Sequence, residues 1–213
     1  AFQKRLVAQP LMRNVLADMA LETEAALALG LRMAKAMDQR ADTHEANLAR
    51  IGTAVAKYWN CKRCPPLVGE ALECHGGPGY VEESIMPRLY REAPLNSIWE
   101  GSGNVMGLDV MRAMGREPDT AHAFVSEVEK ARGHDRYLDA AIDALKAELG
   151  ELEGLEGRMR IVTEMMALTL QGALLAQHAP SQIAEAFCAS RLAPRYRGAF
   201  GTLPAGLDLD TIL

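Results

Sequence analysis

Hydrophobic residues recur every three or four positions along most of this chain, the spacing that places them on one face of an α-helix. The first such stretch runs from Met12 to Asp38, and the second runs from Asp42 to Trp59. Pro65 and Pro66 follow, and we expect them to interrupt the second helix because proline supplies no N–H to the hydrogen-bond ladder. A shorter helix from about Leu67 to Cys74 would then lead into a glycine-rich turn.

Another helix is predicted to start near Ser102, whose hydroxyl can cap the free N–H groups of a first helical turn. The positive N-terminal end of this helix would favour a negative charge or a phosphate nearby. Four apolar residues at helical spacing are expected to form its inner face: Val105, Leu108, Met111 and Met114.

A break follows this helix, because Gly115 stands near a helix end and Pro118 lies just beyond it. A second set of helices comes next, and the one from Arg158 to Gln177 is apolar almost all round, as in a helix buried on several sides. Strand-like alternation is nearly absent. We therefore predict an all-α fold, with an antiparallel helical bundle over residues 1–115, a helical extension over 116–213 and a loosely ordered Gly- and Pro-containing tail.

Composition narrows the possible functions. The 213 residues are 49% hydrophobic and carry a net charge of −5 without a long run of Lys or Arg, so the overall balance points to neither nucleic acid nor a membrane surface. The most apolar segment, Ile161 to Ala176, is broken by Glu164 and Gln171 before it reaches membrane-spanning length. No signal peptide is predicted at the start of the sequence, and we expect a cytoplasmic location.

The cysteines raise the question of a metal site. Cys61 and Cys64 have Cys-x-x-Cys spacing, but a zinc site needs two further ligands, and only Cys74 and His75 lie near. Ordinary reduced thiols are the preferred interpretation, and no metal site is predicted.

The stretch from Glu73 to Asn104 is the least generic part of the chain. Three glycines among residues 76–79 let the backbone turn sharply and approach another molecule closely. Glu100 stands between the bulky pair Ile98 and Trp99 and a Gly-Ser-Gly turn, a setting in which a carboxyl group can be partly desolvated and act as a general base. The alternative is an ion pair with the nearby arginines at 88 and 91, the commoner role of a glutamate in such a place.

In order and spacing, three segments of this stretch resemble the C-terminal part of the acyl-CoA dehydrogenase flavoproteins: Gly76-Gly77-Pro78-Gly79-Tyr80, Arg88-Leu89-Tyr90-Arg91-Glu92 and Ile98-Trp99-Glu100-Gly101-Ser102. With Trp99, Ser102 and Glu92 where the family usually has Tyr, Thr and Asp, the chain is most similar to the AidB-like branch, which is associated with the bacterial alkylation response. Family members carry an N-terminal helical domain and a central β domain before this region, and the resemblance implies that both are absent here.

The resemblance also implies a cofactor, a substrate and an assembly. The cofactor is FAD, and the substrate is an acyl-CoA thioester whose α-proton Glu100 removes while the β-hydrogen leaves as hydride to the flavin. The assembly is a homotetramer in which the glycine turn of one subunit lies near the flavin of another. Carried over by position, the cofactor-binding residues are Gln9, Glu73, Gly76, Gly77, Ser102 and Asn104, and the substrate-pocket residues are Trp99 and Gly101.

Besides Trp99 and Ser102, the chain departs from the family pattern at Glu73 and in the N-terminal region around Gln9. Glu73 stands where the family usually has Gln, and an ionised carboxylate near a pyrophosphate would repel it unless an arginine paired with it. Phe2 matches a family Arg-x-x-Phe-Gly motif, but the arginine of that motif would precede residue 1. The Gln of the family falls at Pro10, beside Gln9. Arg91 matches an arginine that is general in the family, and we expect it to form a structural ion pair.

A DNA-associated protein is the alternative, because the AidB-like branch has been linked to DNA as well as to flavin. Residues 1–115 hold 13 Lys plus Arg against 13 Asp plus Glu, and residues 116–213 hold 10 against 15. Phosphate binding needs local positive clusters, and the extension offers only Arg191, Arg195 and Arg197 close together. Charge therefore disfavours DNA.

Overall fold

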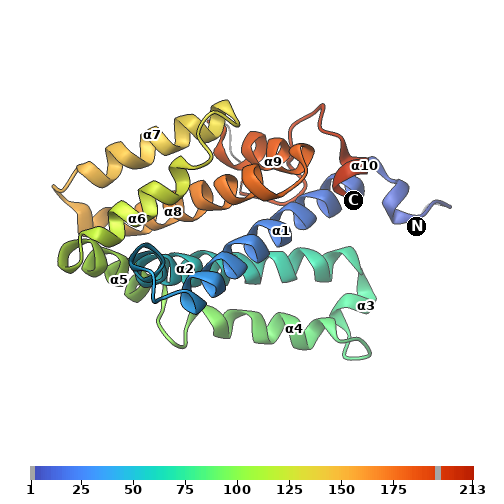
Figure 1. The fold of residues 1–213 in the computed structure, drawn as a ribbon. Coiled ribbons are helices and arrows are strands. Elements are labelled where there is room, and N and C mark those ends of the chain that lie inside the picture. Colours follow the sequence, from blue (N-terminus) through green and yellow to red (C-terminus); the bar gives the residue numbers. More distant parts are fainter. Residues whose placement is uncertain (1–2, 195–197) are drawn as a thin grey trace.

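The computed structural model describes residues 3–194 and 198–213, which form helices and no strand (Figure 1). The predicted all-α fold is confirmed. In chain order the elements are η1 (Leu6–Ala8), α1 (Pro10–Asp38), α2 (Thr43–Cys74), α3 (Gly77–Tyr80), α4 (Met86–Glu92), η2 (Ala93–Ser97), α5 (Gly103–Arg116), α6 (Asp119–Glu129), α7 (Arg136–Gly150), α8 (Leu155–His178), α9 (Ser181–Phe187), the π-helix η3 (Cys188–Leu192) and α10 (Leu209–Ile212).

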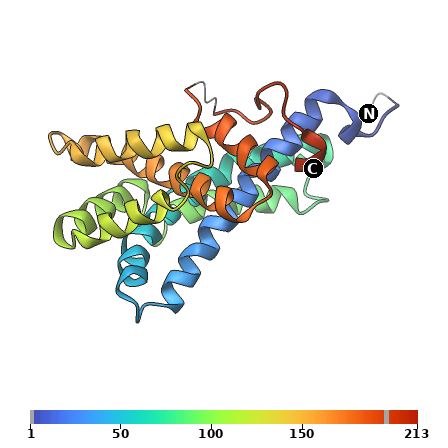
Figure 2. The ribbon, with the colours of Figure 1, turned by 45° about the horizontal axis from the view of Figure 1, so that its top comes forward.

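Two long helices, α1 and α2, form the antiparallel hairpin on which the other elements pack. The carboxylate of Asp42 starts α2 by accepting a hydrogen bond from the N–H of Glu45 at 3.0 Å. Helices α5, α6 and α8 pack against α2. The segment from α3 through α4 to η2 runs back along α2, and the tip of the hairpin projects beyond the other helices in Figure 2.

The expected interruption at the two prolines is wrong, because α2 continues from Thr43 to Cys74 with Pro65 and Pro66 inside it. Each proline removes one intrahelical hydrogen bond, a local cost that does not outweigh the packing of α2 against α1, α4, α5 and η2. A helix that contacts this many neighbours is stabilised by its tertiary environment rather than by local propensity.

The predicted inner face of α5 is also partly wrong. Its buried residues are Gly103, Gly107, Val110 and Ala113, whereas Val105 is 51% exposed and Leu108 is 36% exposed. The small residues let α5 lie close to its neighbours: a Cβ on Gly103 would come within 2.7 Å of Lys62 Cε, and one on Gly107 would touch Met159. Met111 and Met114 are partly buried against the core, as expected. The hydroxyl of Ser102 forms no capping hydrogen bond, contrary to the prediction.

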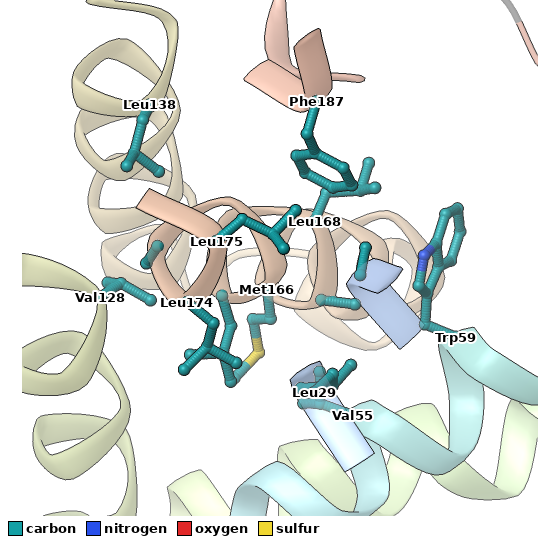
Figure 3. Packing of buried hydrophobic residues seen from close by; sticks show 14 of the residues in the cluster. Leu29, Val55, Trp59, Val128, Leu138, Met166, Leu168, Leu174, Leu175 and Phe187 are labelled. Carbon is teal, nitrogen blue, oxygen red and sulfur yellow. The ribbon is translucent and has the colours of Figure 1, made fainter. Parts of the chain in front are cut away.

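Helix α8 lies at the centre of the hydrophobic core (Figure 3). By length and composition it could cross a membrane, but 72% of its most apolar window is buried inside the protein, which is the environment expected for a core helix. Residues from α1, α2, α6, α7 and α9 pack around it, among them Leu29, Val55, Val128, Leu138 and Phe187. The core is therefore continuous across residue 115, where the sequence predicts a boundary between two helical units.

The tail over residues 198–213 is docked on α1 rather than loosely ordered. Asn14 exchanges two hydrogen bonds with the backbone of Leu203, donating to its C=O at 3.2 Å and accepting from its N–H at 3.0 Å. Leu203 and Ile212 are buried. Hydrogen bonds from a side chain to the backbone, together with apolar burial, attach this segment to α1.

Candidate functional site

The glycine turn joins α2 to α3, and its glycines have different structural roles. Gly76 has φ +62° and ψ −144°, a conformation that residues with a Cβ rarely adopt. A Cβ on Gly79 would lie 2.2 Å from the carbonyl oxygen of Leu72, so the packing of the turn itself requires glycine there. Gly76 and Gly77 are exposed, and a Cβ on either would meet nothing within 4 Å. The backbone at 76 and 77 is therefore open to close approach by another molecule.

A cavity of about 960 Å³ lies beside this turn and is acidic. It is lined by Glu70, Glu73 and Glu82, and its arginine, Arg91, is paired with Glu82 at 2.6 Å. Desolvation by burial, together with the negative charges of Glu73 and Asp18, raises the pKa of Glu70. Glu73 is exposed. Arg91 forms the ion pair expected of it, and its partner is Glu82. This cavity suits hydroxyl or amine donors, and it repels phosphate.

Glu100 lies at the tip of the loop between η2 and α5. Its φ of 56° places it in the left-handed region, and the neighbouring Ile98 and Trp99 are 65% and 55% exposed. Glu100 itself is exposed, so the described residues do not supply the partial burial expected for it. Nor is the alternative ion pair formed, because Arg88 pairs with Glu92 and Arg91 with Glu82.

Beside Glu100 lies a groove of about 640 Å³ between the α1–α2 hairpin and α5. Three cationic side chains line it, Arg40, Arg50 and Lys57, and Arg50 pairs with Asp109 at 3.0 Å. The Nζ of Lys57 donates hydrogen bonds to backbone carbonyls on both sides of Glu100. No local pattern singles out Lys57, because 43 positions separate it from Glu100 in the sequence.

The two predicted cofactor residues at the start of α5 have a basic environment. Arg160, from α8, donates a hydrogen bond to Asn104 Oδ1 at 3.4 Å, and the Nζ of Lys62 lies near Gly103. Ser102 and Asn104 are exposed. Arg160 and Lys62 were not recognisable from the sequence, since each reaches this place from another helix. The combination of two cations with an uncapped helix N-terminus gives this end a positive field.

The structure separates the predicted site residues into groups. Lys57, which contacts the Glu100 loop, and Cys74, which precedes the turn, lie about 25 Å apart along α2 at 1.5 Å per residue. The turn with Glu73, Gly76 and Gly77 thus lies far from Glu100 within one chain. Gln9 is in a third place, half-buried directly before α1, where its N–H bonds to the carbonyl of Leu6 at 2.9 Å.

Comparison with known proteins agrees with this arrangement of motifs. The family model described as "Acyl-CoA dehydrogenase, C-terminal domain" matches residues 1–115. The chain belongs to the acyl-CoA dehydrogenase family. The resemblance stated from the motifs is therefore confirmed.

Individual relatives of this acyl-CoA dehydrogenase family chain extend the similarity beyond residue 115. The AidB protein of Escherichia coli is 44% identical over 187 residues, covering 88% of this chain and 34% of AidB. Acyl-CoA dehydrogenase family member 11 of Caenorhabditis elegans is 34% identical over 197 residues, covering 80% of this chain and 31% of the relative. The chain thus spans about a third of the length of the curated relatives it matches.

A solved structure supports the same fold. The crystal structure of Caenorhabditis elegans ACDH-11 in complex with C11-CoA superposes with a TM-score of 0.78 at 26% sequence identity. The match covers 88% of this chain and 37% of the other. A match of this coverage extends past residue 115 into the helices that follow the family domain.

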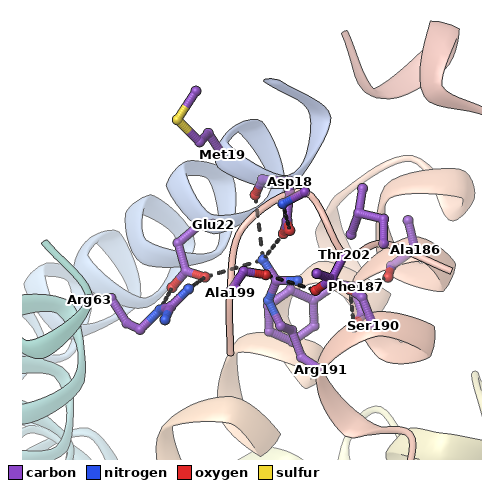
Figure 4. A network of polar contacts seen from close by, with 12 residues as sticks. Asp18, Met19, Glu22, Arg63, Ala186, Phe187, Ser190, Arg191, Ala199 and Thr202 are labelled. Atoms are coloured by element: carbon purple, nitrogen blue, oxygen red, sulfur yellow. Dashed lines mark hydrogen bonds and ion pairs between the residues drawn. The ribbon is translucent and has the colours of Figure 1, made fainter. Parts of the chain in front are cut away.

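Of the basic cluster considered for DNA, the structure describes Arg191, and this residue is buried. Arg191 is 5% exposed and points at α1, where its NH2 group pairs with Asp18 and, at 3.2 Å, with Glu22 (Figure 4). Arg195 and Arg197 lie outside the described residues, as does Phe2 of the N-terminal motif. Arg191 is therefore held by two carboxylates and is not available to phosphates.

The cysteines of the chain are free thiols. Burial raises the pKa of Cys64, assisted by the neighbouring Cys61, and burial raises that of Cys188 to about 12. Over residues 3–194 and 198–213, no group of three His, Cys, Asp or Glu side chains has the arrangement of a metal site. The pKa values of Cys64 and Cys188 favour the protonated thiol, the form least suited to metal binding.

Proposed function

We propose that this chain is the C-terminal part of an FAD-dependent acyl-CoA dehydrogenase in which Glu100 is the base that removes the α-proton of an acyl-CoA thioester. The observation that carries the proposal is the presentation of Glu100. In a chain of this family, the one glutamate of the Ile-Trp-Glu-Gly-Ser motif stands exposed on a left-handed loop beside a groove, without an ion-pair partner among the described residues. The crystal structure of ACDH-11 with C11-CoA supports acyl-CoA as the substrate class.

The chemistry assigned to Glu100 needs a basic carboxylate in a place that water does not reach freely. Its carboxylate would accept the α-proton, and closure of the site by the rest of the full-length protein would raise its basicity. FAD, when bound, supplies the acceptor for the β-hydrogen. Trp99 is 55% exposed beside Glu100, and Gly101 has φ +113°, a backbone conformation that residues with a Cβ rarely adopt. Trp99 would thus form a wall for the acyl chain, and Gly101 would keep the loop in its shape.

The residues of this chain fit different parts of FAD. The open backbone of Gly76 and Gly77 suits close contact with the adenosine half, and the carboxylate of Glu73 suits ribose hydroxyls rather than phosphate. Ser102 and Asn104, near Lys62 and Arg160, suit an anionic segment. Gln9 remains a proposed contact.

In a homo-oligomer, most simply a tetramer, groups that lie far apart within one chain could contribute to the same site, because the turn of one subunit could complete the site of another. The exposed apolar side chains along α3, α4 and the Glu100 loop support such an assembly; they include Tyr80, Ile85, Leu89, Tyr90, Ile98 and Trp99. Sedimentation of the full-length protein as a monomer at micromolar concentration would contradict it. We place the assembly in the cytoplasm, which fractionation can test.

Glu100→Gln tests the function in a full-length, flavin-loaded protein. The change keeps the size of the side chain and removes the base, so reduction of the flavin by acyl-CoA should slow by about a hundredfold or more while flavin content is unchanged. Because the acyl chain of the substrate is unknown, the assay uses a panel of short, branched, aromatic and C11 acyl-CoAs. If none reduces the wild-type flavin, the dehydrogenase assignment fails. A salt-sensitive shift of the protein by duplex DNA in that case would favour the DNA alternative.

A further inference from the structure

Lys57 connects the middle of α2 to the loop that carries Glu100. Its Nζ donates hydrogen bonds to the backbone carbonyls of Asn96 at 2.5 Å, Trp99 at 3.0 Å and Gly101 at 3.1 Å. An ammonium group has three N–H donors and no acceptor, so three carbonyls satisfy it completely. Two of these carbonyls belong to the residues directly before and after Glu100.

The loop needs such an external contact. Glu100 has φ 56°, a conformation that is unfavourable for a residue with a Cβ and that persists only where surrounding contacts impose it. The internal hydrogen bonds of the loop lie before Glu100: the N–H groups of Ile98 and Trp99 both bond to the carbonyl of Leu95. Lys57 therefore supplies the contact that spans the left-handed residue from one side to the other.

The position of the ammonium group is itself well determined. Lys57 precedes Tyr58 and Trp59, each 5% exposed, which anchor this turn of α2 in the core. η2, which leads into the loop, packs against α2 as well. The aliphatic part of the Lys57 side chain thus extends from an anchored turn of α2. Its ammonium group contacts the loop in the groove that Glu100 also lines.

We infer that Lys57 is a positioning residue for Glu100: its ammonium group holds the loop of residues 96–101 in the left-handed conformation that presents the carboxylate to the groove. This inference rests on the proposed role of Glu100 as the base. With its three donors occupied by carbonyls, Lys57 is assigned no proton transfer in this inference. A lysine suits the task better than an arginine, because a planar guanidinium fork cannot direct three donors to three converging carbonyls.

The test compares Lys57→Met with wild type in a full-length, flavin-loaded protein, using two measurements. The first is hydrogen exchange of the backbone amides of residues 96–102, which does not depend on activity. The second is single-turnover reduction of the flavin by whichever acyl-CoA of the panel reduces the wild type. We expect faster exchange in this segment and a rate constant lower by about 10- to 100-fold, with the amplitude of reduction and the flavin content unchanged.

Further variants separate the outcomes. Lys35→Met removes an exposed lysine from α1 and should leave both measurements at the wild-type values. Lys57→Gln retains two donors at the end of a shorter stem and should give an intermediate exchange rate; it also replaces Lys57→Met if that variant loses flavin. If both Lys57 variants showed wild-type exchange and wild-type rates while Glu100→Gln was inactive, the positioning role of Lys57 would be overturned and the proposed function would stand. If Glu100→Gln were as fast as wild type, the proposed function would fail, and the positioning role would fail with it.

Discussion

Arg191 in η3 and Asp18 in α1 form a buried ion pair that joins these two helices (Figure 4). The other carboxylate oxygen of Asp18 accepts a hydrogen bond from the N–H of Gly201 at 2.9 Å. Glu22, one turn further along α1, contacts both Arg191 and Arg63. The π-helix η3 and the tail are thus fixed to α1 by charge as well as by apolar packing.

Arg191→Met should destabilise the protein by about 3–5 kcal/mol, because it leaves Asp18 buried without its cationic partner. Urea unfolding followed by circular dichroism measures this cost. Arg112→Met is the matched control, since Arg112 is 54% exposed in its pair with Asp109, and should change stability by less than about 1 kcal/mol. Equal effects of the two variants would contradict the structural role given to Arg191.

The ionisation of Glu127 makes the free energy of unfolding depend on pH in the acidic range. Burial opposes ionisation of this carboxyl group, but hydrogen bonds and charges from Arg32 and Lys130 outweigh burial and lower its pKa from 4.5 to about 2. A pKa that is lower in the folded state gives stability that is present above pH 4.5 and is lost as pH falls from there to about 2. In Glu127→Gln, the free energy of unfolding should therefore fall less steeply across this window than in wild type.

Glu129→Gln provides the comparison for that experiment. Hydrogen bonds from Arg132 and Lys146 lower the pKa of Glu129 to about 2 as well, but this side chain lies near the surface. Salt screens exposed charges more than buried ones, and at 0.5 M ionic strength the Debye length is below about 8 Å. We therefore expect 0.5 M salt to weaken the contribution of Glu129 to the pH dependence of stability and largely to spare the contribution of Glu127. The same salt sensitivity in both variants would contradict the buried position of Glu127.

Gly79 and Gly77 should respond differently to alanine. Gly79→Ala places a Cβ 2.2 Å from the backbone oxygen of Leu72 and should destabilise the protein by about 1–3 kcal/mol or more, because backbone cannot yield as a flexible side chain can. Gly77→Ala meets nothing within 4 Å and should change stability by less than about 1 kcal/mol. Thermal unfolding measures both. In the full-length protein Gly77→Ala should nevertheless retain less flavin, and normal flavin content there would argue against a backbone contact at this position.

Pro66→Ala should stabilise α2. The substitution restores an N–H that can bond to the carbonyl of Lys62 within the helix, and it removes the clash of the proline ring with that turn. We expect a gain of about 1 kcal/mol or more, reduced by the greater freedom of alanine in the unfolded chain. A loss of stability, measured by urea unfolding, would instead mean that α1 and α4 pack against a bend that Pro66 maintains.

Local sequence signals predicted much of the fold. Helical periodicity identified the first helix and the buried helix now seen as α8, and Gly115 and Pro118 indicated the end of α5, because each signal is encoded by residues close together in the chain. The motif order around Glu100 identified the family for the same reason. The prediction of an interrupted α2 was wrong because the local penalty of two prolines was weighed without the tertiary packing that offsets it.

The sequence by itself determined the all-α class, the family and the identity of the candidate base. Only the tertiary structure decided which residues surround that base. Lys57 meets the Glu100 loop from α2, Arg160 reaches Asn104 from α8, and Arg191 turns inward to Asp18. Such pairs join residues that are far apart along the chain, and their geometry follows from how helices pack, which no local pattern of apolar and polar residues specifies.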